Sequence, residues 1–181
     1  MIDKWLKTIL AIVALLLLLM LGNPPVWAEN PWGIGIDLGF LADTVDDTML
    51  TMSFQGDYYL NSKFSIGPQI LLSPGEDLTQ LTVAGVARYH IPLGSVSVIP
   101  FGGVGFVYAD LDRGDTDDDV SYSFPFGATA AFQINRTISL ASTLIVTYQD
   151  IDLDNRKSSD NFNIGMLFGF RFNPWNRRDS F

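Results

Sequence analysis

From Trp32 onward, large apolar residues occupy every second position of the chain in eight successive segments. A period of two places successive side chains on opposite faces of a β-strand. In the first segment one face carries Trp32, Ile34, Ile36, Leu38 and Phe40, and the other carries Gly33, Gly35, Asp37 and Gly39. The pattern recurs at 50–60, 64–72, 81–91, 96–108, 120–132, 138–148 and 162–172. It predicts about eight strands, none with a charge on its apolar face.

The fifth segment, 96–108, departs from this pattern. Ile99, Phe101 and Val107 fall on the face that is polar in the other segments. A bulge inserts one residue into a strand and changes which side chains face which way. We therefore predict a bulge at Gly102-Gly103 that switches the parity of this strand.

The connections between the segments also alternate, in this case in length. Short turns rich in turn-forming residues are predicted at 61–63, 92–94 and 135–137, and longer polar links at 42–48, 73–80, 110–119 and 150–161. Three short and four long connections leave both chain ends on the short-turn side. Outer-membrane barrels combine an even strand number with short turns at one end and long loops at the other.

The composition of the second face decides which face meets lipid. A soluble barrel needs Lys, Glu and Asp outside, whereas the second face here consists mostly of Gly, Ser, Thr, Gln and Ala. Small residues suit the interior of a narrow eight-stranded barrel. Only 17% of the chain is charged, against about 25% in ordinary soluble domains. We therefore predict an all-β fold, a closed antiparallel up-and-down transmembrane β-barrel.

The N-terminus has the organisation of a cleavable signal peptide. Lys4 and Lys7 precede an apolar stretch, Ile9 to Leu21, and Val26-Trp27-Ala28 forms a small-residue cleavage pattern. We predict a signal peptide at 1–28, a barrel at 29–173 and a short C-terminal tail at 174–181. A retained N-terminal anchor is the alternative. Export through a signal peptide, together with a transmembrane barrel, predicts a location in the outer membrane.

Aromatic residues cluster near the ends of the segments, as in the interfacial girdles of membrane barrels. Ordinary strand aromatics are the alternative explanation, because such residues favour strands in any case. The predicted girdle comprises Trp32, Tyr58, Tyr89, Tyr108, Tyr122, Tyr148 and Phe172.

Few charges are predicted to point inward, and they are Asp37, Asp57, Arg88 and Arg171, with His90 beside them. Asp57, Arg88, His90 and Arg171 lie near the short-turn ends of their strands, which predicts one ion-paired cluster in the lower interior. An isolated buried ion costs several kcal/mol, roughly, so these charges must be paired. We expect the cluster to act as a structural plug, with a gated ion or proton path as the alternative.

With these features the chain resembles the OmpA/OmpX-type family of small outer-membrane barrels, with OmpW-like barrels as more distant relatives. The alternating aromatics Phe168, Phe170 and Phe172 look like the C-terminal signal that the outer-membrane assembly machinery recognises in that family. Nine further residues, 173–181, follow this signal and depart from the pattern. The resemblance implies that the assembly machinery, outer-membrane lipid and lipopolysaccharide are the partners of a monomer.

Catalytic and metal chemistry receive little support from the residues. Some barrels of this size modify lipid A with a histidine and a serine near the outer rim, but His90, the single histidine, precedes Pro92 at the opposite end. We predict no enzyme, no catalytic residue and no cofactor. The acidic segment with Asp110, Asp112, Asp115 and Asp117 is a weak candidate for a divalent cation, and it lacks EF-hand spacing. Solvated, mutually repelling carboxylates are the alternative.

The sequence therefore predicts a structural or surface-interaction barrel with a filled interior. The net charge of −9 argues against nucleic acid as a partner, because phosphate binding needs a basic surface. Two other functions remain open. One is a minor pore for small or apolar solutes, and the other is a lipid A-modifying enzyme.

Overall fold

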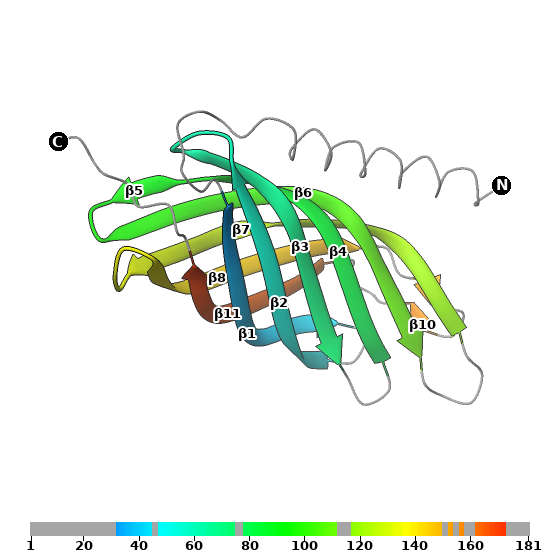
Figure 1. Cartoon of the computed structure of the whole chain (residues 1–181). Coiled ribbons are helices and arrows are strands. Elements are labelled where there is room, and N and C mark those ends of the chain that lie inside the picture. The colour runs from blue at the N-terminus through cyan, green and yellow to red at the C-terminus, as the bar shows by residue number, and fades with distance from the viewer. Residues whose placement is uncertain are drawn as a thin grey trace.

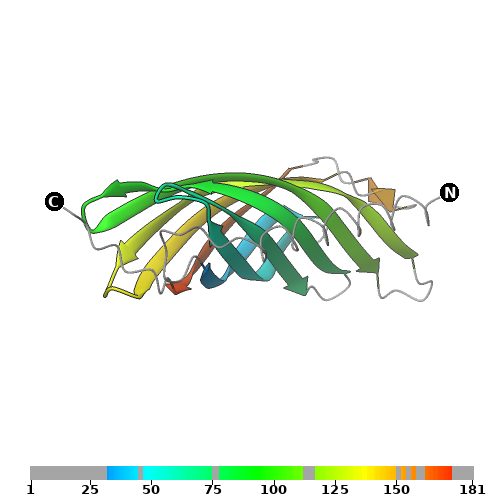
Figure 2. The same ribbon diagram turned by 45° about the horizontal axis from the view of Figure 1, so that its top comes forward.

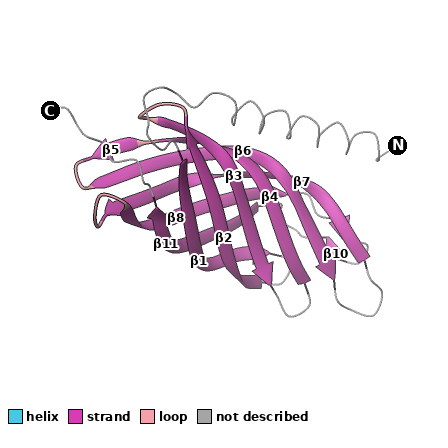
Figure 3. Ribbon diagram, viewed as in Figure 1, coloured by secondary structure: helices cyan, strands magenta, loops and turns pink. Residues whose placement is uncertain are grey.

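The computed structural model describes residues 32–44, 47–74, 78–111, 117–149, 152–153, 156–157 and 162–172, and every regular element in these ranges is a β-strand (Figure 3). The strands are β1 (Trp32–Thr44), β2 (Asp47–Tyr59), β3 (Phe64–Pro74), β4 (Leu78–Tyr89), β5 (Ile91–Leu93), β6 (Val96–Leu111), β7 (Asp117–Gln133), β8 (Ile138–Gln149), β9 (Asp152–Leu153), β10 (Arg156–Lys157) and β11 (Phe162–Phe172). No helix in these ranges is long and apolar enough to cross a membrane.

Eight of the described strands close into one antiparallel barrel. The hydrogen-bonded order is β1, β2, β3, β4, β6, β7, β8 and β11, and β11 pairs with β1 to complete the circle. The strands are tilted and wrap around a common axis (Figures 1 and 2). Closure pairs the backbone groups that a sheet edge would leave open, as hydrocarbon requires. The predicted fold class is confirmed.

The two ends of the barrel differ. The turn end carries the connections Leu60–Lys63, Gly94–Ser95 and Ile134–Thr137, together with the start of β1 and the end of β11. The loop end carries the connections 45–46, 75–77, 112–116 and 150–161. The short strand β5 pairs with β6 at the turn end, and the β9–β10 hairpin belongs to the opposite end (Figure 1).

Three of the predicted long links are shorter than expected. β1 continues to Thr44 and β2 begins at Asp47, so residues 42–48 mostly belong to strands, and β3, β4, β6 and β7 extend in the same way. Antiparallel backbone pairing needs no apolar side chain, so polar residues can prolong the ladder beyond the apolar zone. The prediction of long links at 42–48, 73–80 and 110–119 was therefore wrong.

The two faces of the barrel have the predicted composition. On β8, Leu144 is 56% exposed on the outer face, and its neighbour Ile145 is fully buried inside. The outer face carries a continuous apolar surface, for example Leu38, Phe54, Phe126 and Phe168, while Thr51, Ser53 and Ser65 are buried in the interior. This arrangement is the one that lipid requires and water does not favour.

The fifth segment contains no bulge. Pairing of β6 with β4 and with β7 keeps a constant register on both sides of Gly102-Gly103. Ile99, Phe101 and Val107 are all buried, and Phe106 and Tyr108 are exposed, so one parity holds throughout. The predicted switch was wrong because these three apolar residues fill the interior and do not face lipid.

Candidate functional site

The interior near the turn end contains a cavity of about 90 Å³. Its wall includes Asp57, Arg88, His90 and Arg171, which come from β2, β4, the residue after β4, and β11. All four lie within a few residues of the turn end of their strands. The sequence placed these groups together, and the structure brings them to the wall of one cavity.

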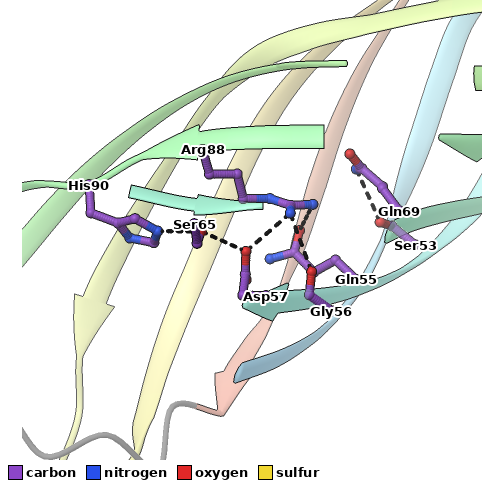
Figure 4. A network of polar contacts seen from close by, with 8 residues as sticks. All are labelled: Ser53, Gln55, Gly56, Asp57, Ser65, Gln69, Arg88 and His90. Carbon is purple, nitrogen blue, oxygen red and sulfur yellow. Dashed lines mark hydrogen bonds and ion pairs between the residues drawn. The ribbon is translucent and has the colours of Figure 1, made fainter. Parts of the chain in front are cut away.

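Arg88 and Asp57 form a buried ion pair with 3.1 Å between Nη1 and Oδ1 (Figure 4). Ser65 donates its hydroxyl hydrogen to the same Oδ1 at 2.9 Å, and its Oγ lies 2.8 Å from His90 Nε2. The His90 ring also packs on Tyr59, with 5.1 Å between the ring centroids. Three neighbouring strands are therefore connected through polar side chains.

Arg171 is held by different partners. Its Nη1 contacts Asp37 Oδ1 in a second buried ion pair, and its Nη2 donates to Thr143 Oγ1 at 3.2 Å. Arg171 lies opposite Gly35 in the ladder between β11 and β1, and Asp37 is the next inward residue along β1. The inward charges thus form two ion pairs. The prediction of a single ion-paired cluster was wrong, because register gives Arg171 a carboxylate on its own neighbouring strand.

Several interior polar contacts were not foreseen in the sequence. Gln55 accepts from Arg88 Nη2 at 3.4 Å, and Gln69 donates to Ser53 (Figure 4). Other pairs are Thr51 with Ser73, Thr129 with Thr143, and Gln80 with Gln149. Each joins inward residues of different strands, so the strand register would have been needed to find them.

An apolar layer crosses the interior beyond the cavity. It consists of Leu71, Ala84, Val86, Phe101, Ile145 and Leu167, all buried and contributed by β3, β4, β6, β8 and β11. Val86 is the next inward residue after Arg88, and Phe101 is the next after Ile99 of the cavity wall. The apolar layer therefore lies on the loop side of the cavity, with side chains from five of the eight barrel strands. The signal in the sequence was a bulky apolar residue on an inner face of mostly small or polar residues, once on β3, β4, β8 and β11 and three times on β6.

Most of the predicted girdle residues lie on the outer surface. Trp32, Tyr89, Tyr108, Tyr122 and Phe172 are exposed, and Tyr148 is half-buried. Tyr58 is buried and packs edge-on against Trp32, with 4.9 Å between ring centroids. At the loop end, Tyr148 contacts Phe124 on one side and Phe162 on the other.

The residues of the predicted assembly signal face outward. Phe168, Phe170 and Phe172 are exposed and pair with Leu38, Ile36 and Ile34 of β1. They stand at the seam where the barrel closes. The predicted signal peptide, 1–28, and the tail, 174–181, lie outside the described residues.

The acidic segment is described only in part. In the β6–β7 ladder, Asp110 pairs with Asp118 and Asp117 pairs with Leu111. Asp112 and Asp115 lie outside the described residues. Among the residues that the structure describes, no three His, Cys, Asp or Glu side chains gather in a way that could hold a metal ion.

Ser65 and His90 have the distance but not the setting of a nucleophile and its base. In such a site the carboxylate orients the histidine and the nucleophile is reachable. Here Asp57 accepts from Ser65 instead, and Ser65 is fully buried. Both residues lie at the turn end, as predicted for His90. This arrangement favours a structural hydrogen-bond network.

The chain matches a known family model in sequence and resembles solved outer-membrane barrels in fold. A family model described as the outer membrane protein beta-barrel domain matches residues 11–172. Neisserial surface protein A (NspA) has a similar fold, with a TM-score of 0.62 at 12% identity, covering 79% of this chain and 97% of that one. The N-terminal β-barrel domain of Pseudomonas aeruginosa OprF gives a TM-score of 0.50 at 11% identity, covering 77% and 96%. No curated protein matches significantly.

Proposed function

Since the chain belongs to the outer membrane protein beta-barrel family, and is therefore an outer-membrane barrel, we propose that its role is structural or surface-interacting, without catalysis and without an open pore. The turn end then faces the periplasm and the loop end faces outward, as in other barrels with this layout. The observation that carries the proposal is the apolar layer across the lumen.

A water-filled path needs a continuous polar lumen, and large barrels provide one while eight-stranded barrels fill their interior with side chains. In this barrel Phe101, Ile145 and Leu167 are buried in the apolar layer. An ion would have to leave water and cross this layer at a cost of several kcal/mol, roughly. This supports a closed interior over the minor pore.

Planar-bilayer conductance of the purified full chain tests the closed interior. We expect no discrete conductance steps, with the same detergent preparation of a known open porin as positive control. Steps of defined size that appear with the wild-type chain would establish the minor pore instead.

A surface role is supported by the length of the central hairpin. β6 has 16 residues and β7 has 17, whereas about 9–11 residues suffice to cross the membrane. The surplus carries the backbone of this hairpin beyond the apolar zone at the loop end. β7 begins there with Asp117 to Asp119, which pair with the last residues of β6. We propose lipopolysaccharide as the partner there, with divalent cations bridging its phosphates to the carboxylates.

A photo-crosslinking amino acid at Val120, which is 64% exposed near the loop end, tests this partner. We expect it to capture lipopolysaccharide on intact cells. The matched control is the same amino acid at Leu93, which is 61% exposed at the turn end. Capture from Leu93 but not Val120 would contradict the proposed orientation, and capture from neither would contradict the partner.

The absence of catalysis is proposed from the geometry of Ser65 and His90. Expression of the wild-type chain should leave the mass of lipid A unchanged. A mass shift that disappears with Ser65→Ala would overturn this proposal and identify the nucleophile.

We further propose that residues 1–28 are removed on export and that Phe168, Phe170 and Phe172 are read by the assembly machinery. Intact-mass measurement of the outer-membrane form should give a chain that starts at Glu29. Replacing Phe170 and Phe172 by Ser should reduce the folded fraction in membranes, while Phe132→Ser, at an exposed outer position of β7, serves as the control. A monomer is expected by native mass spectrometry.

A further inference from the structure

The wall of the turn-end cavity carries more positive than negative charge. Arg88 and Arg171 both line it, and Asp57 is the single carboxylate among the described lining residues. The side chains on the wall alone therefore carry one positive charge in excess, and the compensating carboxylate, Asp37, contacts Arg171 from behind the wall. Like charges that share a small cavity repel one another, and a bound anion would relieve this repulsion.

Asp37 neutralises Arg171 from outside the cavity wall. It contacts Nη1 of Arg171 but does not line the cavity. Nη1 also donates to the carbonyl oxygen of Phe170 at 3.4 Å, and Nη2 donates to Thr143 Oγ1. Among the described residues Nε of Arg171 has no hydrogen-bond partner. A guanidinium has five N–H donors, so the Arg171 group keeps donor capacity after these three contacts. Asp37 and Thr143 thus hold the group in place without satisfying it.

Arg88 is similarly positioned. Its Nη1 donates to Asp57 Oδ1 at 3.1 Å and to the carbonyl oxygen of Gly56 at 3.4 Å. Its Nη2 reaches Gln55 only at 3.4 Å, and both 3.4 Å contacts are long, weak hydrogen bonds. The side chain of Arg88 is 3% exposed, so its remaining donors must be satisfied within the cavity and not by bulk solvent.

We propose that this cavity binds one small oxyanion, a phosphate or carboxylate group, between the guanidinium groups of Arg88 and Arg171. Planar guanidinium donors match the oxygens of such groups in geometry and charge. Ser97 and Ser139 place hydroxyl groups on the same wall. A volume of about 90 Å³ accommodates several waters or one such anion. The apolar layer closes the loop side, so the anion enters from the turn end.

Isothermal titration calorimetry of the full chain, folded in detergent micelles, tests the site. Sodium phosphate and sodium acetate are titrated separately, each against sodium chloride at equal ionic strength. Binding of phosphate alone identifies a phosphate site, and binding of acetate identifies a carboxylate site. Failure of both anions to bind overturns the proposal.

Arg171→Gln should weaken binding by about tenfold or more, because a charged donor is lost. The matched control is Arg136→Gln, which removes the same charge from an exposed turn at the same end. Equal weakening in both variants would show a surface charge effect and overturn the site.

If Arg171→Gln does not fold, Ala131→Leu keeps both arginines and fills the cavity from a lining position. We expect it to abolish binding. Wild-type affinity in this variant would place the anion elsewhere and overturn the proposal. The outcome is independent of the conductance experiment, because a closed barrel can bind an anion at its turn end or leave the cavity to water.

Discussion

Arg88 on β4 and Asp57 on β2 form an ion pair across the intervening strand β3, with 3.1 Å between Nη1 and Oδ1. β3 contributes Ser65, which donates to the same carboxylate oxygen. The pair and Ser65 therefore connect three consecutive strands at the turn end of the interior.

Arg88→Met should destabilise the folded barrel by about 3 kcal/mol, because it leaves the Asp57 carboxylate buried without its cation. The midpoint of urea unfolding in micelles, followed by heat-modifiable mobility on gels, measures the loss. The double variant Asp57→Asn with Arg88→Met should lose clearly less than the two single variants added together. Additive losses would mean that the two groups do not interact.

Phe101→Ala combined with Leu167→Ala should open the lumen, because both side chains belong to the apolar layer. We expect small, brief conductance steps in planar bilayers together with a stability loss of about 3 kcal/mol or more. Phe126→Ala with Leu140→Ala removes one Phe and one Leu side chain from the outer face and should show no conductance steps. If neither double variant shows conductance steps, another layer of side chains blocks the barrel.

Leu144→Arg should destabilise the barrel by about 2–4 kcal/mol, because Leu144 stands on the outer face in the middle of β8 and faces the hydrocarbon. Unfolding from phospholipid vesicles measures the effect. Ser62→Arg, in an exposed turn, introduces the same side chain outside the apolar zone. It should cost less than about 1 kcal/mol. Equal costs would argue against a lipid-facing outer surface.

Gly169→Ala should be costly, because a methyl group there would overlap the carbonyl oxygen of Ile36 on the adjacent strand. We expect a loss of about 1–3 kcal/mol in the free energy of unfolding. Gly85→Ala makes the same substitution on β4 where no atom lies within 4 Å, and it should be neutral or slightly stabilising. A neutral Gly169→Ala would show that the two backbones can separate without cost.

The period of two was sufficient to predict the barrel, its strand number and its lipid-facing side, since each depends only on which residues alternate. It also placed Asp57, Arg88 and His90 near one end. It did not reveal that Arg171 pairs with Asp37, because that contact depends on the register between the first and last barrel strands.

The apolar layer was misinterpreted for a related reason. Phe101 and Ile99 were read as a change of phase in one strand, although Val86, Ile145 and Leu167 occupy the inner faces of other strands in the same way. Val86, Ile145 and Leu167 are each a single bulky exception within their own segment, whereas the fifth segment contains three. Phe101 and the three single exceptions form one layer only when the strands are placed side by side in the barrel. The period of the sequence does not give their relative heights, so it does not predict the layer.

The seam between β1 and β11 has a kinetic consequence. Its residue pairs, such as Ile34 with Phe172 and Leu38 with Phe168, join the first and last strands of the barrel. These contacts raise the contact order, and high contact order slows folding. Before β11 (Phe162–Phe172) has paired, β1 and β8 each have one edge whose backbone N–H and C=O groups lack partners. Such unpaired edges are prone to aggregation.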